Sequence, residues 1–407
     1  MIDKAISTNI RLASSVPRSA RVLFAVLSKL QHGRLDIIAP GGQRFSFPGA
    51  LPGPDACIEL VDWDVCGDIL RGGDIGFAEA FLTGRWITPD LTAVLTVAAL
   101  NHAAFEQAIY GRWWVKLLYR LRHLIRSNTR SGSRRNIHAH YDLGNDFYQH
   151  WLDRSMTYSS GLFAGDLSRS LEEAQLAKYD RVLRLVNPKP GERILEIGCG
   201  WGGFAEYAAR SRGCEVYGVT LSRRQLEYAR ERVNRAGLAE KVTFEFRDYR
   251  DIQGQFDHVV SIEMYEAVGQ RFWPLYFRTV RERLAPGGNA VVQGIAIADH
   301  LFARYRRGTD FIQQYIFPGG MLASPSVLRD QVVRAGLAIQ SVHTFGLDYA
   351  ETLKRWNQAF HQAWGEIQRM KGFDMRFKQL WHFYLSYCEA GFRAGTTDVL
   401  QLELTHA

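Results

Sequence analysis

The fold is decided by residues 193–203, which read R-I-L-E-I-G-C-G-W-G-G. The first half is an apolar run that predicts a buried strand, and the second half is a glycine-rich loop that leads into a helix. Glycines at 198, 200 and 202 let the backbone turn tightly and come close to a ligand. The spacing is not G-x-G-x-x-G and no phosphate-binding signature follows, so a nucleoside without a pyrophosphate fits better than a dinucleotide.

Strand and helix candidates alternate through the rest of the C-terminal two thirds. A helix is expected from Ser222 to Val233, with Ser222 and Gln225 placed as a capping box. This alternation predicts an α/β fold with a mostly parallel, seven-stranded sheet and helices on both faces. A long helical segment, residues 347–395, separates the last two strands. The strand candidates are residues 193–198, 215–220, 242–248, 256–263, 289–297, 338–345 and 398–405.

Composition narrows the class of protein. The chain has 407 residues, of which 23% are charged and 46% hydrophobic, as in ordinary globular domains. The length suggests two domains, and no run of about 20 apolar residues predicts a membrane-spanning helix. No secretory signal is recognised at the N-terminus. Five cysteines without a C-x-x-C pair fit reduced thiols in a cytosol, and no metal site is expected.

The positive charge is concentrated near the N-terminus. The net charge is +8, and residues 1–135 hold 17 Lys and Arg against 11 Asp and Glu. Residues 112–135 carry eight of these cations and no acid, with Trp and Leu at spacings of three and four, which predicts a basic amphipathic helix. Such a helix suits an anionic membrane surface, although a core-packing helix with solvated cations explains the pattern as well. Nucleic acid is not expected, because no recognised binding motif accompanies the patch.

Two shorter features organise the region around this helix. Residues 35–38 and 43–47 alternate like a hairpin around Pro40-Gly41-Gly42. Residues 127–133, rich in Ser, Asn, Gly and Arg, have the composition of a linker. A boundary between two domains is therefore expected close to this segment.

The acid-x-Gly-x-Gly-x-Gly loop that begins at Glu196 resembles the S-adenosylmethionine loop of the class I methyltransferases. In most of those enzymes the second strand ends in an acid, whereas here it ends in Thr220. This departure reduces the number of methyltransferase families that the sequence can resemble. Together with the other motifs, the sequence resembles the cyclopropane fatty acid synthase family, which includes the mycolic acid cyclopropane synthases. The matching motifs occur in family order at residues 73–86, 140–146, 156–160, 195–203, 218–222, 248–251, 315–320, 345–349 and 392–394.

The resemblance implies a division of the chain and a reaction. Residues 1–125 would form a small α+β lipid-binding or membrane-binding domain and residues 126–136 a linker. Residues 137–407 would form a Rossmann-like class I methyltransferase domain, with helical acyl-binding insertions near 300–330 and 347–395. The reaction would transfer a methyl group from S-adenosylmethionine to the cis double bond of a phospholipid acyl chain. A cytoplasmic, peripheral location on the inner face of the membrane and a homodimer are expected as well.

The family's cofactor contacts carry over onto matching positions. Tyr158 and Ser159 would contact the methionine end of the cofactor, and Gly198, Gly200 and Gly202 would lie along it. Thr220 and Gln225 would hold the ribose, and Asp248 with Tyr249 would flank the adenine.

The family closes the cyclopropane ring with a bound bicarbonate as the base, held by Cys, Glu, His, Tyr and a backbone amide. Here the Glu matches Glu266, the Tyr matches Tyr349, and the amide falls at Ile295. Ser160 and Gln293 stand in place of the Cys and the His. Both can donate hydrogen bonds to an anion, but Gln cannot accept a proton as a neutral His could.

Three hypotheses about the function of this protein follow. A cyclopropane product is favoured, and a methyl-branched or methylene product is the alternative if the cation loses its proton elsewhere. A small-molecule N- or C-methyltransferase is a second class, since fold alone does not settle the substrate. A non-catalytic lipid-binding module is a third, against which the intact glycine loop and the retained Glu266 argue.

Overall fold

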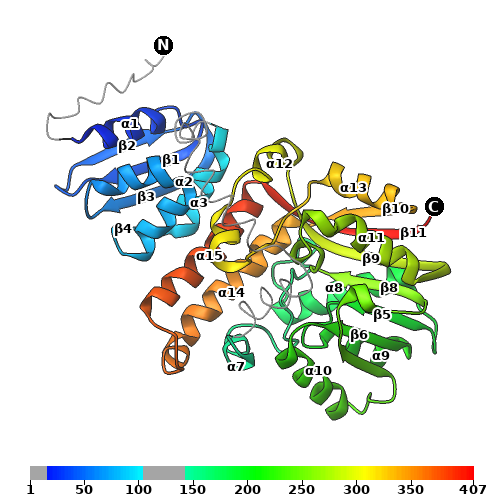
Figure 1. The fold of residues 1–407 in the computed structure, drawn as a ribbon. Helices are drawn as coiled ribbons and strands as arrows, with labels where there is room; N and C mark the ends of the chain where they lie inside the picture. The colour runs from blue at the N-terminus through cyan, green and yellow to red at the C-terminus, as the bar shows by residue number, and fades with distance from the viewer. Residues whose placement is uncertain (1–15, 104–142) are drawn as a thin grey trace. The chain divides into compact units, whose positions relative to one another are not determined.

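The structure is a computed structural model that describes residues 16–103 and 143–407 (Figure 1). The chain forms two compact units that divide within residues 104–142. The predicted basic helix, the linker and the predicted domain boundaries lie outside the described residues, so these stay predictions. Each unit is described by itself below.

The N-terminal unit contains a four-stranded sheet in the order β2-β1-β3-β4. The strands are β1 (His32–Ile38), β2 (Arg44–Pro48), β3 (Leu51–Leu60) and β4 (Trp86–Ile87), and the helices are α1 (Arg18–Leu27), α2 (Asp64–Leu82) and α3 (Leu91–Leu100). Strands β1 and β2 pair antiparallel, which confirms the predicted hairpin, whereas β1 and β3 pair parallel. This α+β arrangement agrees with the fold expected for the N-terminal region.

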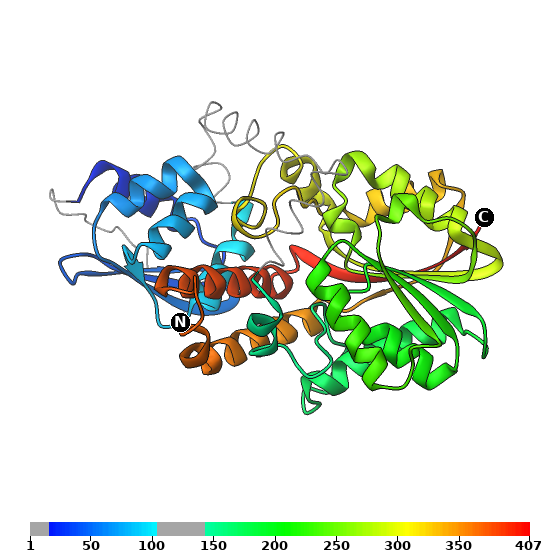
Figure 2. The ribbon, with the colours of Figure 1, turned by 60° about the horizontal axis from the view of Figure 1, so that its bottom comes forward.

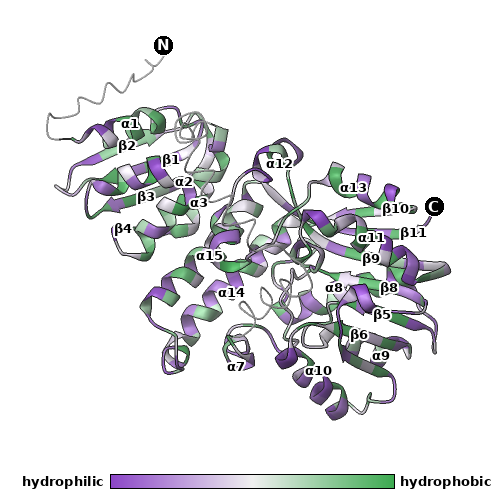
Figure 3. Ribbon diagram, in the orientation of Figure 1, coloured by the Kyte–Doolittle hydropathy of each residue, from purple (hydrophilic) through white to green (hydrophobic). Residues whose placement is uncertain are grey.

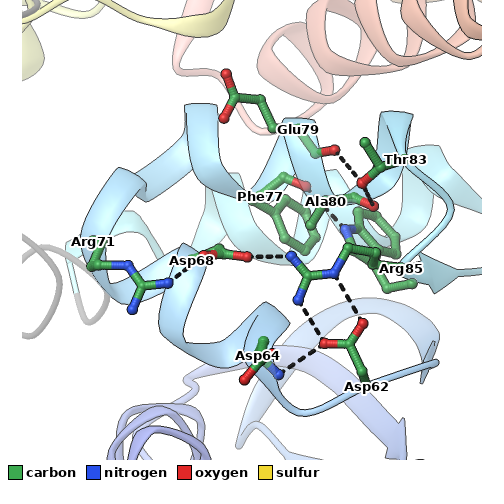
Figure 4. Close-up of polar contacts among 10 residues, drawn as sticks. Asp62, Asp64, Asp68, Arg71, Phe77, Glu79, Ala80, Thr83 and Arg85 are labelled. Carbon is green, nitrogen blue, oxygen red and sulfur yellow. Dashed lines mark hydrogen bonds and ion pairs between the residues drawn. The ribbon is translucent and has the colours of Figure 1, made fainter.

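Arg85, directly before β4, holds the long helix α2 in place (Figure 4). Arg85 donates from Nε and Nη2 to the two oxygens of Asp62, at 2.9 and 2.6 Å, and from Nη1 to Asp68 at 2.5 Å. The helix bends at Gly73, whose φ of 60° lies in the left-handed region. The forked guanidinium therefore ties the loop before α2 and the first half of α2 to the edge strand.

The C-terminal unit is built on a seven-stranded sheet in the order β10-β11-β9-β8-β5-β6-β7. The strands are β5 (Arg193–Ile197), β6 (Glu215–Thr220), β7 (Val242–Phe246), β8 (Phe256–Ile262), β9 (Leu284–Ile297), β10 (Leu337–Thr344) and β11 (Thr397–His406). Strands β9, β8, β5, β6 and β7 run parallel, and β11 pairs antiparallel with both β9 and β10. The mostly parallel α/β sheet is thus confirmed.

Successive side chains of the inner strands point to opposite faces of the sheet, and they pack there into two separate hydrophobic cores. Ile194 and Val260 pack on one face with α8 (Leu171–Val186), α9 (Gly203–Arg212) and α10 (Arg223–Arg235). Their neighbours Leu195 and Val259 pack on the other face with α11 (Trp273–Arg283) and α13 (Pro325–Arg334). In Figure 3, α10 is mostly in the hydrophilic colour, since its buried residues form a single stripe.

Helices also fill the two predicted insertions. The first contains α12 (Asp299–Tyr305), a π-helical turn (Ile312–Ile316) and α13. The second is a helical hairpin of α14 (Gly346–Ile367) and α15 (Met375–Arg393), which lie side by side in Figures 1 and 2. Trp356 and Phe360 are fully buried and Trp364 nearly so, as expected for core aromatics at helical spacing. Among residues 16–103 and 143–407, no helix combines the length and apolarity needed to span a membrane.

Candidate functional site

The glycine loop lies between the end of β5 and the start of α9. Gly198, Gly200 and Gly202 all have positive φ, at 86°, 50° and 80°. A Cβ at Gly202 would lie 3.0 Å from both the Ala229 Cβ and the Phe244 ring, so close packing requires glycine there. A Cβ at Gly200 would have no atom within 4 Å, which leaves this position open to a ligand. A Cβ at Gly198 would likewise lie 2.8 Å from Met264 Cγ, so the loop has two glycines needed for packing and one, Gly200, that faces open space.

Asn145, the first residue of α7 (Asn145–Gln149), bridges this loop to the next one. Its Oδ1 accepts a hydrogen bond from Trp201 Nε1 at 2.9 Å, and its Nδ2 donates to the Arg224 carbonyl at 3.1 Å. The bridge joins the glycine loop to the first turn of α10. Sequence reasoning quoted the motif that contains Asn145 without assigning the residue a role.

The predicted ribose-binding residues lie together at the end of β6. Thr220 Oγ1 donates to Gln225 Oε1 at 2.9 Å, and the Ser222 hydroxyl caps α10 by accepting from the Gln225 backbone N–H. The second half of the predicted capping box is wrong: the Gln225 side chain turns to Thr220, and the Ser222 N–H bonds to Thr220 Oγ1 at 3.1 Å instead. Thr220 and Gln225 form one polar pair that stays a prediction for the ribose.

The predicted adenine-flanking residues follow β7. Both oxygens of the buried Asp248 accept hydrogen bonds from Arg250, at 2.8 and 2.6 Å. The adjacent Tyr249 is buried with no hydrogen-bond partner for its hydroxyl, and burial raises its pKa. Asp248 therefore has its charge balanced within the loop, while Tyr249 offers a ring and a free donor.

A buried lysine lies under the segment expected at the methionine end. Lys178 Nζ donates to Ser159 Oγ at 2.5 Å and to Gln175 Oε1 at 2.7 Å. Burial lowers the pKa of Lys178 to about 7, although the negative charges of Glu263 and other acids raise it. The hydroxyl of Tyr158 lies 2.6 Å from that of Tyr384 on α15. Ser159 is thus fixed by Lys178, a residue that the sequence analysis did not single out.

The loop geometry fits S-adenosylmethionine. Glu196, at the position of the family's acid, is buried and its Oε2 has no hydrogen-bond partner, so burial raises its pKa well above the ordinary value. An unpartnered buried carboxyl oxygen beside an open glycine position is what a loop prepared for a polar ligand would show.

A second buried carboxylate lies at the carboxyl end of β8. Glu263 follows Ile262 directly, and its backbone φ is 51°, a left-handed conformation that non-glycine residues seldom adopt. Its Oε1 accepts from the Ser160 N–H at 2.9 Å and from Gln293 Nε2 at 2.8 Å, and its Oε2 accepts from the Tyr349 hydroxyl at 2.6 Å. Sequence reasoning missed Glu263, although an acid directly after a buried strand and three residues before Glu266 was a usable signal.

Glu266 lies in the short helical turn Tyr265–Ala267. Its Oε1 accepts from the Ile295 N–H at 2.5 Å, and its Oε2 is buried without a partner. Burial and the nearby charge of Glu263 raise the pKa of Glu266 to about 8. Burial also raises the pKa of Glu263 above its ordinary value, although the Tyr349 hydroxyl and the charge of Lys178 offset part of this increase. Of the two acids, Glu263 is the one that its surroundings favour as a carboxylate.

The structure brings together the five residues predicted around the bicarbonate, but their donors are already engaged. Ser160, Gln293 and Tyr349 donate to Glu263, and Ile295 donates to Glu266. The Ser160 hydroxyl turns away to the Gly161 carbonyl, so this residue contributes its N–H instead. These residues do not fit a bound bicarbonate, because a protein carboxylate occupies the donors that would hold it.

Aromatic rings adjoin the carboxylates. The ring centroid of Trp356 lies 6.1 Å from that of Tyr349 and 5.3 Å from that of Tyr158. Tyr349 also stacks on Phe392 at 4.6 Å. The site therefore combines a buried anion with electron-rich ring faces, the two kinds of group that stabilise a cation.

Comparisons with known proteins agree with this arrangement. Residues 128–402 match the family described as mycolic acid cyclopropane synthetase. The tuberculostearic acid methyltransferase UfaA1 of Mycobacterium tuberculosis is 40% identical over 342 residues, which cover 82% of this chain and 79% of that protein. The cyclopropane-fatty-acyl-phospholipid synthase of Escherichia coli K12 is 34% identical over 354 residues, covering 85% and 87%.

A solved structure carries the same fold. Mycolic acid cyclopropane synthase CmaA1, complexed with SAH and CTAB, is 28% identical with a TM-score of 0.62, and the match covers 67% of this chain and 97% of that one. The chain belongs to the mycolic acid cyclopropane synthetase family and is a class I methyltransferase that uses S-adenosylmethionine.

Proposed function

We propose that this enzyme transfers the methyl group of S-adenosylmethionine to a double-bond carbon of an unsaturated phospholipid acyl chain. The observation that carries the proposal is the buried cluster of Glu263, Glu266, Tyr349 and aromatic rings. Methylation of an alkene passes through a carbocation, which needs an anion and electron-rich ring faces beside it and an acceptor for the proton that it must lose. Relatives named for fatty acids and phospholipids support the same substrate class.

The chain's own residues have defined tasks in this reaction. When bound, S-adenosylmethionine supplies an electrophilic methyl group. The faces of Trp356 and Tyr349 and the charge of Glu263 stabilise the cation that forms on the acyl chain. The buried surroundings exclude water, which would trap the cation as an alcohol. A carboxylate then takes up the proton that the cation must lose.

For the product, we favour a methylene-bearing or methyl-branched chain. Ser160 and Gln293 replace the Cys and His that hold the family's ring-closing bicarbonate, and the relative with 40% identity is named as a methyltransferase rather than as a cyclopropane synthase. A cyclopropane is the second candidate, because the Escherichia coli relative with 34% identity is named as a cyclopropane synthase.

The experiment uses purified enzyme, vesicles of an unsaturated phosphatidylglycerol and methyl-labelled S-adenosylmethionine. Labelled acyl chains one methylene unit heavier support the proposal, and ozonolysis separates the products. A methylene-bearing chain is cleaved to a ketone, whereas a cyclopropane survives. No label in any acyl chain, with label instead in an added small amine, would overturn the proposal.

We also propose that residues 112–135, through their eight cations, bring the enzyme to anionic membrane surfaces. Sedimentation with vesicles should then increase with the anionic lipid fraction and decrease with salt. Binding that does not change with lipid charge would contradict this role.

A homodimer stays a prediction, for which the sedimentation velocity of the free enzyme is the direct test.

A further inference from the structure

We infer that the Glu263 carboxylate takes the place of a bound bicarbonate, so that this enzyme carries its proton acceptor in its own chain. The inference deepens the proposed function and rests on it for the identity of the proton donor. It assigns a role to a residue outside the set carried over from the family.

The hydrogen bonds of Glu263 carry the inference. A small anion at this position would need donors from several sides, and Glu263 receives three from three separate segments: Ser160, Gln293 and Tyr349. These are three of the positions expected to hold bicarbonate. The fourth donor, the Ile295 N–H, points to Glu266. No donor of the predicted set is left for an external anion.

Gln401 fixes the same arrangement through Gln293. Gln293 Oε1 accepts a hydrogen bond from Gln401 Nε2 at 2.8 Å, which orients the Gln293 amide so that its N–H group faces Glu263. The amide therefore donates to the carboxylate and cannot compete with it for a proton. A histidine at this position could have shared the proton, and its replacement leaves Glu263 as the acceptor.

The backbone of Glu263 is consistent with a placed functional group. Its φ of 51° is disfavoured for a residue with a side chain and is readily adopted by glycine. A glycine would fit the turn better, yet the chain has a glutamate whose carboxyl is buried and fully hydrogen-bonded. Conformational strain at a buried carboxylate is a common sign of a functional requirement.

The two acids of the cluster have different roles. Glu263 accepts three hydrogen bonds, and these together with the charge of Lys178 favour its carboxylate form, against burial, which raises its pKa. Glu266 accepts one hydrogen bond and is repelled by Glu263, so it keeps a proton near neutral pH. One carboxylate therefore serves as the proton acceptor, and its neighbour stays neutral beside it.

The chemical step balances with groups that the reaction supplies. The π electrons of the alkene form the new bond to the methyl carbon, the carbon–sulfur bond breaks, and its electron pair stays on sulfur. For a methylene product, a hydride first moves from the methyl-bearing carbon to the neighbouring cationic carbon, so that the cation lies next to the new methyl group. The methyl group then loses a proton to the Glu263 carboxylate, and its C–H electron pair becomes the π bond of the methylene group. For a cyclopropane no hydride moves, and the C–H electron pair of the methyl group forms the bond to the cationic carbon. In both cases the neutral carboxyl later releases the proton to solvent.

The first test compares the enzyme with and without bicarbonate. Wild-type enzyme in degassed buffer treated with carbonic anhydrase should keep its rate of acyl methylation, and added bicarbonate should not raise it. Carbon-13 NMR with labelled bicarbonate should show no bound signal. A rate that falls on bicarbonate removal and returns on its addition, or a bound signal in the wild type, would overturn the inference.

Two variants sharpen this test. Glu263→Gly removes the carboxylate, suits the positive φ, and leaves the three donors unpaired. It should lose about 10²- to 10⁴-fold in rate and recover part of the loss with bicarbonate, with a bound NMR signal. Glu263→Gln fills the same space with an amide that accepts no proton. It should lose as much, without rescue or signal.

The outcomes separate the two proposals. If no acyl chain is methylated under any condition, the proposed function fails, while the NMR binding of bicarbonate to wild type and Glu263→Gly still decides the inference. If acyl chains are methylated but Glu263→Gln retains the wild-type rate, the inference fails and the proposed function stands. S-Adenosylhomocysteine affinity close to wild type in both variants shows that the cofactor site is intact.

Discussion

The two halves of the site differ in how the chain builds them. In the cofactor half, each loop is held by residues close in sequence: Thr220 and Gln225 are five positions apart, and Ser222 and Gln225 are three apart. The carboxylate half brings Glu263 together with Ser160, 103 positions away, and with Tyr349, 86 positions away. Each loop of the first half is a property of one strand–loop–helix unit, with the glycine loop after β5 and the Thr220–Gln225 pair after β6, whereas the second half is a property of the whole C-terminal unit.

This difference indicates which substitutions should disrupt each half of the site. A local loop depends on backbone conformation, so its weak points are glycines. An assembled cluster depends on several side chains at once, so removing one partner leaves a buried charge with fewer donors. Substitutions should therefore affect the fold and cofactor binding in the first half, and the rate and its pH dependence in the second.

The largest effect is expected at Gly202. A valine there combines a φ of 80° with a Cβ only 3.0 Å from Ala229 and Phe244. Gly202→Val should lower the free energy of unfolding by more than about 2 kcal/mol and abolish S-adenosylhomocysteine binding. Denaturant unfolding and isothermal titration calorimetry measure the two effects.

Gly200→Ala is the matched control, because its Cβ meets no atom within 4 Å. Its φ of 50° strains an alanine by about 1 to 2 kcal/mol, but without a steric clash, so the loss of stability should be smaller than in Gly202→Val. The variant should bind S-adenosylhomocysteine more weakly, since the added methyl group enters the open space beside the loop. Equal affinity in Gly200→Ala and wild type would show that the cofactor does not approach this position.

The next effect is expected at Tyr349. Tyr349→Phe removes one hydrogen bond to the Glu263 carboxylate and should lower kcat by about 10- to 100-fold. The lost donor also raises the pKa of Glu263, so the acid limb of the pH–rate profile should move to higher pH.

Tyr384→Phe tests whether this shift is specific. Its hydroxyl meets that of Tyr158 rather than a carboxylate, so the acid limb should stay where it is in the wild type. If Tyr349→Phe slows the reaction with an unmoved acid limb, Tyr349 acts in packing and not through the charge of Glu263.

The same contrast explains what the sequence could and could not predict. Strand β5, the glycine loop and the cap at Ser222 follow from local patterns, and the structure has all of them. The set of residues around Glu266 came from the family resemblance, and the structure does gather them. Glu263 was missed because its partners come from three separate segments, and no local spacing marks them as neighbours.

Orientation within the site was the other limit of sequence reasoning. Ser160 was expected to face an anion with its hydroxyl, but that hydroxyl bonds the Gly161 carbonyl, and the backbone N–H faces Glu263 instead. Gln225 was expected to close a capping box, yet its amide pairs with Thr220. Residue type alone does not decide which of several donors a side chain or backbone presents.

A smaller effect, on stability, is expected at Glu266. Its pKa of about 8 in the folded protein lies above the ordinary value of 4.5, so folding favours the protonated form. This stabilisation is complete below about pH 4.5 and is lost as the pH rises through 8. Glu266→Gln cannot ionise, so relative to wild type it should gain on the order of 2 kcal/mol between pH 6 and pH 7.5. Urea unfolding at both pH values measures the gain, and an unchanged difference would contradict the assignment.

The smallest effect is expected at Asn145, which tests whether the cofactor half is as local as its loops suggest. Asn145→Ala removes both hydrogen bonds of the bridge between Trp201 and the Arg224 carbonyl, and affinity for S-adenosylhomocysteine should fall about tenfold. Asn145→Asp keeps an acceptor for Trp201 but loses the donor to Arg224, so its affinity should lie between alanine and wild type. Wild-type affinity in both variants would mean that the glycine loop and the first turn of α10 hold their positions without α7, and the cofactor half would then be a strictly local structure.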